Sequence, residues 1–167
     1  EPVAGFFDLF LVGDGEEAFL EIIEKYLELK GRTSNREDVL KELAGIPGVY
    51  VPSLYETYLP AGSPLLAVKP KKAAPASVRK RVLGSFSRSY FPENIIVPNI
   101  QVVFDRVGIE VARGCPEKCR FCQATSLYAP FRIKNPSFVV EKLWQSLQAT
   151  GYEDASLFSL SVCDYPY

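Results

Sequence analysis

Histidine and methionine are absent from this sequence of 167 residues, and tryptophan occurs only once. Without histidine, no residue of the chain can act as an imidazole base or bind cobalt or zinc through an imidazole. Paired catalytic carboxylates, a Ser/His/Asp set and a phosphate-binding glycine loop are missing as well. None of these sites therefore competes for a catalytic role with the cysteine motif described below.

Long apolar runs are also missing, because no stretch approaches the roughly 20 residues that a membrane helix needs. The start of the sequence does not resemble a signal peptide, so we expect no membrane partner. Hydrophobic residues make up 47% of the chain, which is enough for the packed core of one or two domains. Because the sequence starts at Glu1 without methionine and stops at Tyr167, just past a predicted strand, we expect an internal piece of a longer protein.

Cysteine is scarce, but three of the four cysteines fall within eight residues, spaced Cys-x3-Cys-x2-Cys at Cys115, Cys119 and Cys122. Disulfides between them would close short, strained loops and leave one cysteine unpaired. Three thiolates this close can instead share one small metal centre, and soft sulfur ligands suit iron–sulfur clusters or zinc. Unpaired thiols also belong in a reducing compartment, so we expect a cytoplasmic protein.

The number of available ligands favours iron over zinc. A structural zinc site normally takes four ligands, and the chain offers only the distant Cys163 as a fourth. A four-iron cluster held by three cysteines leaves one iron open for chemistry. Zinc binding by the same residues, and ordinary free thiols, stay as alternatives.

The motif, with the aromatic Phe121 just before its last cysteine, resembles the signature of the radical S-adenosylmethionine (radical SAM) enzymes. In that family S-adenosylmethionine chelates the open iron, and an electron splits it into methionine and a 5′-deoxyadenosyl radical that abstracts hydrogen from a substrate. The resemblance thus implies a 4Fe-4S cluster, S-adenosylmethionine and a reductant such as ferredoxin or flavodoxin. It leaves the substrate unknown.

Further stretches resemble one subfamily of these enzymes, whose N-terminal domain is like the cobalamin-binding fold. They are residues 104–106, 109–114, 128–132 and 159–165. The resemblance implies that the cluster is bound by Cys115, Cys119 and Cys122. It also implies that Phe121 shields the cluster and presents its backbone toward the adenine.

The end of the second strand commonly carries a Gly-Gly-Glu-like motif in this family, which binds the methionyl amino group. Asp164 stands at the matching place and is a candidate cofactor-binding residue, with a plain turn residue as the alternative. Cys163 replaces a glycine of the subfamily, and we expect it to be a buried free thiol, with crowding of the cofactor as the alternative. Arg113 and Arg120 are candidates for neutralising cluster or cofactor charge, and Arg132 is a weaker one.

The expected fold class is α/β. Residues 1–32 fit the C-terminal end of a doubly wound, cobalamin-binding-like domain, because the apolar run over 6–12 predicts a parallel strand buried on both faces and a helix follows it. Asp14 is the predicted N-cap of that helix, with Glu17 completing a capping box. Cobalamin itself is not supported within this chain, since there is no histidine to coordinate cobalt.

Residues 33–104 fit a proline-rich connector between domains. A short helix opens after residues 33–35, and 8 of the 13 prolines lie between Pro47 and Pro98. Residues 57–92 carry seven basic side chains and no acidic one. A nucleic-acid contact is possible there, but a solvated linker is favoured, because the aromatic residues lack a repeated pairing with basic ones and are expected to be packing anchors. These aromatic residues are Tyr55, Tyr58, Phe86, Tyr90 and Phe91.

Residues 105–167 fit the first βαβ unit of a partial TIM-like, radical SAM barrel, which this piece leaves incomplete. Strands are predicted over 107–112 and 155–161, with a helix between them that Asn135 caps and Gly151 ends. The inward stripe of this helix is predicted to be Val139, Val140, Leu143 and Leu147. Barrels of this kind place active sites at the carboxyl ends of their strands, so the cysteine loop and the tail after residue 161 should lie side by side.

Two functions from different classes follow. The first is a radical SAM enzyme, present here as a fragment that alone would be feebly active or inactive. The second is a non-catalytic module in which the cysteines bind metal only to fix a loop. An RNA-modifying, methylthiotransferase-like enzyme is a further alternative, suggested by the basic connector.

Overall fold

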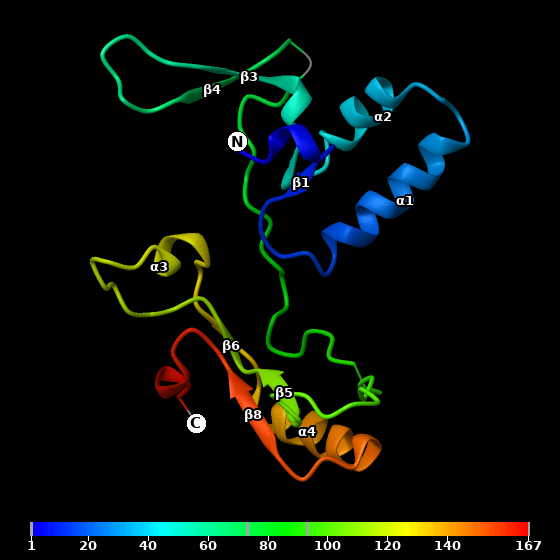
Figure 1. The fold of residues 1–167 in the computed structure, drawn as a ribbon, viewed down its shortest axis with the longest axis vertical. Helices are drawn as coiled ribbons and strands as arrows, with labels where there is room; N and C mark the ends of the chain where they lie inside the picture. Colours follow the sequence, from blue (N-terminus) through cyan, green and yellow to red (C-terminus); the bar gives the residue numbers. More distant parts are fainter. Residues whose placement is uncertain (1, 73, 93, 167) are drawn as a thin grey trace. The chain divides into compact units, whose positions relative to one another are not determined.

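A computed structural model of the chain describes residues 2–72, 74–92 and 94–166. Glu1 and Tyr167, the outer bounds of the first and last predicted domains, lie outside the described residues. The fold is a mixed α/β one with small sheets, in two compact units, Glu1–Leu83 and Gly84–Tyr167 (Figure 1). The division falls within the predicted connector, and the domain bounds at residues 32 and 104 stay predictions.

The described residues of the first unit form two α-helices and two antiparallel strand pairs. Its elements in order are η1 (Ala4–Phe6), β1 (Phe10–Leu11), α1 (Ala18–Lys30), α2 (Arg36–Leu43), β2 (Val49–Tyr50), η2 (Pro52–Leu54), β3 (Tyr55–Tyr58) and β4 (Ala67–Pro70). Helices α1 and α2 pack through Leu29, Val39 and Leu43, and β2 and the residues after it add Val49 and Val51 to the core. As predicted, Asn35 opens α2, since its side chain accepts a hydrogen bond from the Glu37 N–H at 3.0 Å.

The strand predicted over residues 6–12 is the main difference in this unit. Only Phe10–Leu11 forms a strand, and it pairs antiparallel with β2, whereas a parallel strand buried on both faces was expected. Phe6 and Phe7 are exposed. The connection from β1 to β2 runs through two helices, α1 and α2, so the chain reverses once more than in a strand–helix–strand unit and returns antiparallel to β1.

Asp14 is not the N-cap of α1, contrary to the prediction. The helix begins at Ala18, and the Asp14 carboxylate accepts a hydrogen bond from the Leu83 N–H at 2.7 Å. Gly13 pairs with Arg81 across a parallel bridge, with a φ of 113° that suits glycine alone. This long-range pairing holds Asp14 against residues 81–83. A capping pattern read from neighbouring residues cannot predict that position.

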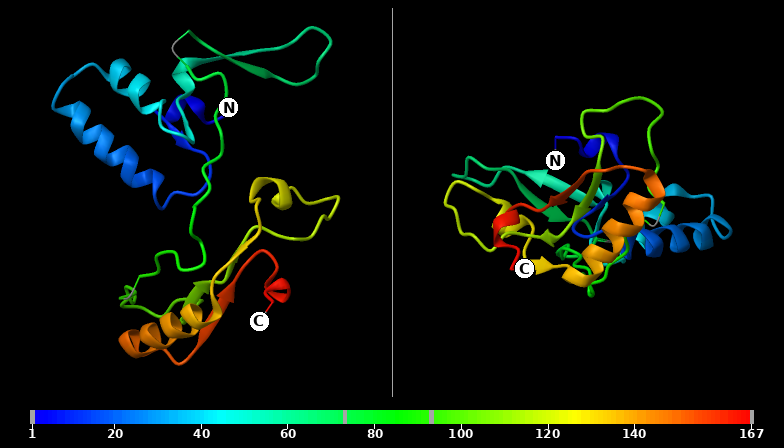
Figure 2. Two further views of the ribbon diagram at one scale, coloured as in Figure 1. Left: turned by 180° about the vertical axis from the view of Figure 1, so that it is seen from behind. Right: turned by 90° about the horizontal axis from the view of Figure 1, so that it is seen from below.

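The second unit contains a parallel strand pair and the longest described helix. Its elements are β5 (Val107–Glu110), β6 (Ala112–Arg113), α3 (Ala124–Leu127), β7 (Arg132–Ile133), α4 (Pro136–Thr150), β8 (Ala155–Phe158) and η3 (Val162–Asp164). Strands β5 and β8 pair in parallel from Val107↔Ala155 to Glu110↔Phe158, which confirms the predicted βαβ unit. Figure 2 shows α4 beside this pair. The extension of the sheet into a barrel stays a prediction.

Helix α4 begins and ends where predicted, but not every residue of its predicted inward-facing apolar stripe is buried. The Asn135 side chain accepts from the Phe138 N–H at 3.3 Å, and Gly151 ends the helix with a φ of 74°. Val139 is buried against Ile109 and Val111, but Val140 is 67% exposed. The predicted stripe was too wide, because the sheet under the helix has only two described strands. None of the described helices has the length and apolar character needed to cross a membrane.

Candidate metal centre

The three motif cysteines lie on one loop that is closed at its base. Strands β6 and β7 pair antiparallel, Ala112 with Ile133 and Arg113 with Arg132, so residues 114–131 leave and return at the same place. Gly114 stands at the crossing with a φ of 89°. A β-carbon there would lie 2.8 Å from the Tyr128 carbonyl oxygen and 2.9 Å from that of Pro130, so the two ends of the loop approach each other more closely than any side chain allows.

The base of the loop is joined to the parallel strand pair. The Val111 N–H donates to the Phe158 carbonyl at 2.9 Å, and the Lys134 N–H donates to the Val111 carbonyl at 2.8 Å. After β8, the Tyr165 hydroxyl donates to the Lys134 carbonyl, also at 2.8 Å. The tail that carries Asp164 therefore lies beside the base of the cysteine loop, at the carboxyl ends of β5 and β8.

The motif cysteines are free thiols on this loop, and Cys115 is next to Gly114 at the loop base. Cys115 is half-buried, whereas Cys119 and Cys122 are exposed. A turn joins them, in which the Cys122 N–H donates to the Cys119 carbonyl at 3.1 Å, and the Ala124 N–H at the start of α3 points to the Cys122 sulfur at 3.4 Å. A second hydrogen bond, from the Thr125 hydroxyl to the Glu117 carbonyl, joins α3 to the segment between Cys115 and Cys119.

The donor set fits a cluster in its chemistry. Three unoxidised thiols lie within one turn-forming segment, and two of them are open to solvent, as ligands that receive a metal must be. Among the described residues, however, no three cysteine or carboxylate side chains are gathered in a group ready to hold a metal ion. The loop thus carries three thiols on a fixed base, and their sulfur atoms are not gathered into one group.

The remaining sequence candidates lie around this loop. The Phe121 side chain is 92% exposed, next to Cys122. Asp164 is half-buried in η3. Cys163 is exposed, so its predicted burial is wrong, because the residue of this segment that packs against the core is Tyr165. Arg120 is exposed in the loop.

A group of cations under the loop was only partly foreseen. The Phe86 ring is 3% exposed, and the cationic groups of Arg113, Arg132 and Lys134 lie 4.9, 5.5 and 4.7 Å from its centroid. Arg113 is also held by both oxygens of Glu110, through its Nε at 2.9 Å and its Nη2 at 2.7 Å. Each cation gains from the electron-rich face of the ring, so Phe86 positions positive charge at the base of the loop.

Lys134 is buried and is part of the same group. Its ammonium donates to the hydroxyl and the carbonyl of Ser89, the latter at 3.3 Å. The Asn135 N–H donates to the Ser87 carbonyl at 2.9 Å. Residues 86–89, which the sequence assigned to a connector, are therefore a structural support of the cysteine loop. No sequence signal indicates this, because the partners are about 45 residues apart and the Phe86 ring looks like any packing anchor.

Comparisons with known proteins agree with the resemblance in part. Residues 1–52 match the family model for the N-terminal region of radical SAM proteins. A protein of Methanocaldococcus jannaschii, described as uncharacterized, is 24% identical over 170 residues. That alignment covers 99% of this chain but 30% of the relative, so the chain spans less than a third of the relative's length. No solved structure matches the chain. The family match supports a relationship to the radical SAM proteins, and in general terms to an enzyme-type protein.

Proposed function

We propose that this chain carries the cluster-binding loop of a radical SAM enzyme, which reductively cleaves S-adenosylmethionine and uses the resulting radical on a substrate yet to be identified. The observation that carries the proposal is the Cys-x3-Cys-x2-Cys loop, closed at its base and set at the carboxyl end of a parallel strand. The family match supports it independently, because residues 1–52 lie outside the motif. The activity proposed is that of the whole protein.

Cys115, Cys119 and Cys122 would hold a 4Fe-4S cluster as thiolates. When bound, such a cluster supplies the electron that splits the sulfonium of S-adenosylmethionine into methionine and a 5′-deoxyadenosyl radical. An external reductant such as ferredoxin or flavodoxin would provide that electron in the cytoplasm. The alternative of zinc is weaker, since the motif offers three ligands and a closed zinc site takes four.

Side chains around the loop have roles in binding and shielding. Phe121, exposed beside Cys122, would cover the centre and keep water from it. Asp164, which is held near the loop base through the Tyr165–Lys134 hydrogen bond, would accept a hydrogen bond from the methionyl ammonium group. Arg113, fixed by Glu110 and Phe86, would complement the negative charge of a thiolate-bound centre.

The test is anaerobic reconstitution with iron and sulfide, followed by electron paramagnetic resonance of the reduced protein with and without S-adenosylmethionine. We expect a four-iron signal that S-adenosylmethionine perturbs. The Cys119→Ala variant should lose it, and the matched variant Cys163→Ala should keep it, because Cys163 is exposed and lies outside the motif. Stoichiometric zinc binding without iron incorporation would refute the proposal and leave a metal-fixed loop.

A further inference from the structure

Cys119 and Cys122 stand at the two ends of one hydrogen-bonded turn. The Cys122 N–H donates to the Cys119 carbonyl at 3.1 Å, across the turn residues 120–121. A turn of this kind keeps the α-carbons of its first and fourth residues within about 7 Å of each other. A disulfide spans about 4.4–6.8 Å between α-carbons, so the backbone brings these two cysteines to about the separation that a disulfide needs.

Both side chains of this pair are accessible to a small reactant. Cys119 and Cys122 are exposed free thiols, and the Phe121 side chain between them is exposed as well. The Ala124 N–H donates to the Cys122 sulfur at 3.4 Å. An amide donor at this position stabilises negative charge on sulfur, which is the charge that a sulfur atom carries when it attacks or leaves a disulfide.

Cys115 belongs to the fixed base of the loop instead. It is half-buried and follows Gly114, where the two ends of the loop approach each other. Farther along, the Glu117 carbonyl accepts a hydrogen bond from the Thr125 hydroxyl, which ties this stretch to α3. A disulfide to Cys115 would have to rearrange these contacts, whereas the pair in the turn uses the backbone as it stands.

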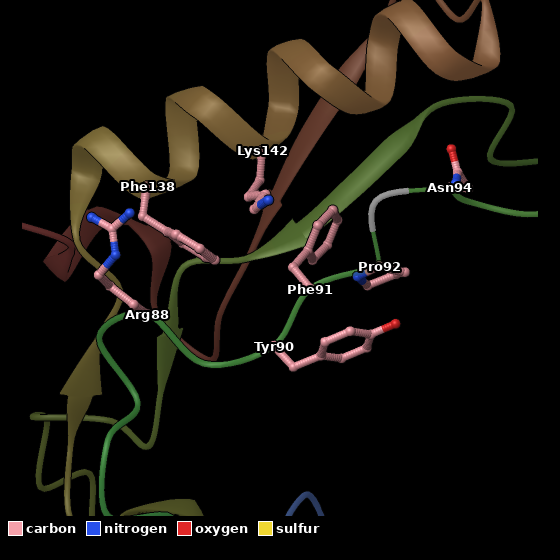
Figure 3. Close-up of a pocket in the computed structure, with 7 residues that line it drawn as sticks. All are labelled: Arg88, Tyr90, Phe91, Pro92, Asn94, Phe138 and Lys142. Atoms are coloured by element: carbon pink, nitrogen blue, oxygen red, sulfur yellow. The ribbon is translucent and has the colours of Figure 1, made fainter.

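The support below the loop also acts on the base rather than on the turn. Residues 86–91 run from the base along α4, and the Arg88 guanidinium lies 5.3 Å from the centroid of the Phe138 ring. Phe91 packs against the buried cluster that joins β5 to α4, and Figure 3 shows it turned toward the helix, with Tyr90 turned away. The sequence predicted Tyr90 to be a packing anchor, and that prediction is wrong, because Tyr90 is 81% exposed and Phe91 makes the core contact. Among the described residues, the contacts of this segment therefore lie at the base of the loop and along α4.

We infer that Cys119 and Cys122 form a reversible disulfide, which controls whether the loop can load its cluster. An oxidised pair would leave Cys115 as the single motif thiolate, which is too few ligands for a four-iron cluster. A disulfide between cysteines with two residues between them is strained, and strained, exposed disulfides are readily reduced. This property suits a switch in a reducing compartment, where lasting disulfides are rare and transient ones serve redox sensing. The inference adds regulation to the proposed function and rests on it only for this consequence.

The oxidant is a small disulfide of the glutathione type. One thiolate of the pair attacks a sulfur of the oxidant, breaks its S–S bond and releases one thiolate of the oxidant. The second cysteine then attacks the protein's sulfur in this mixed disulfide, which forms the Cys119–Cys122 bond and releases the second thiolate of the oxidant. The pair loses two electrons and two protons in total, and the oxidant is reduced to two thiols.

The test uses the metal-free, full chain in mixtures of reduced and oxidised glutathione, followed by alkylation of free thiols, digestion with trypsin and mass spectrometry. Trypsin cleaves after Arg113, Lys118 and Arg120, so each motif cysteine lies on a different peptide. We expect one linked pair, of the peptide 119–120 with the peptide 121–132. Dithiothreitol should separate the two peptides again.

Single variants identify the pair. Cys115→Ser and Cys163→Ser should keep the linked peptides, because neither residue takes part in the turn. Cys119→Ser and Cys122→Ser should each lose the link and hold glutathione on the remaining cysteine of the turn, since no second thiol is there to release it. Circular dichroism checks that each variant is folded.

Cobalt(II) is the probe for the consequence, because its bonds to thiolate sulfur absorb in the near ultraviolet. The reduced chain should show this absorption, and the oxidised chain should lose it until dithiothreitol is added. The inference is overturned if the linked pair contains Cys115 or Cys163, if no link forms in equimolar reduced and oxidised glutathione, or if the oxidised chain binds cobalt as the reduced chain does. Failure of the reduced chain to take up iron would instead remove the proposed function and leave the disulfide standing.

Discussion

Replacing Gly114 by alanine should open the base of the cysteine loop. The residue has a φ of 89°, a conformation that costs an L-amino acid about 1–2 kcal/mol. Its β-carbon would also meet the carbonyl oxygens of Tyr128 and Pro130 at 2.8 and 2.9 Å and the α-carbon of Phe131 at 3.0 Å. These are backbone atoms, which cannot rotate away as a side chain can, so overpacking adds about 1–3 kcal/mol.

The sum, about 2–5 kcal/mol, is borne by the two-residue ladder between β6 and β7. A pairing of only two residues is too weak to stay formed against this cost. We therefore expect the Gly114→Ala variant to lose most of its capacity to retain iron after reconstitution. Hydrogen exchange at the amides of residues 112–113 and 132–134 should become faster, while α4 stays protected.

Two other glycines of the same unit are the controls. Gly151 has a φ of 74° but open space around its α-carbon, so Gly151→Ala imposes the conformational cost without the clash. Gly84 has neither a positive φ nor a neighbour within 4 Å, so Gly84→Ala imposes neither. Iron retention and exchange rates in Gly114→Ala equal to those in Gly84→Ala would refute the closed-loop argument.

Two further predictions concern the units themselves. Tyr55 donates from its hydroxyl to the Pro75 carbonyl at 2.9 Å, and burial raises its pKa above the usual value of 10.0, so the folded state favours the protonated phenol. The stability that the neutral Tyr55 hydroxyl contributes should be fully present below pH 10.0 and should be lost as the pH rises through the pKa of the folded state. Tyr55→Phe should therefore lower the free energy of unfolding in urea by about 0.5–1.5 kcal/mol at neutral pH, and the difference between the two proteins should become smaller in alkali. A difference that stays constant with pH would contradict this account. Asn135→Ala should lower stability by about 0.5–2 kcal/mol in thermal unfolding, and Asn135→Asp should restore it, since aspartate also caps the Phe138 N–H; equal melting temperatures for the two variants would exclude the cap.

Features that follow from short-range chemistry could be predicted from the sequence. Asn135 and Gly151 mark the ends of α4 because a cap and a left-handed C-terminal residue are each decided within a few residues. The parallel pairing of β5 with β8 follows from the helix between them. The cysteine motif can likewise be recognised in the sequence, because its spacing involves only neighbouring residues.

Features that depend on distant partners could not be predicted. Asp14 looks like a helix cap, but its carboxylate bonds to the Leu83 N–H, 69 residues away. Phe86 looks like a packing anchor, but it also holds the cations of Arg113 and Lys134 in place. In both cases the residue type fits two roles, and the tertiary contact decides which one is used. The contacts that support the cysteine loop were therefore missed, while its cysteine ligands stay a prediction.

The loop thus has a base fixed by the protein and a tip left open to solvent. Backbone pairing, Gly114 and the Tyr165–Lys134 hydrogen bond fix the base without any metal. Farther out, a turn at Cys119 and Cys122 and the Thr125–Glu117 hydrogen bond order the loop, and in the proposed function metal binding would supply the remaining ordering free energy. A fixed base lowers the entropic cost of gathering three sulfur atoms, because the ends of the segment already lie together. In the proposed function, weakening the base should therefore reduce iron retention after reconstitution even when every cysteine is present.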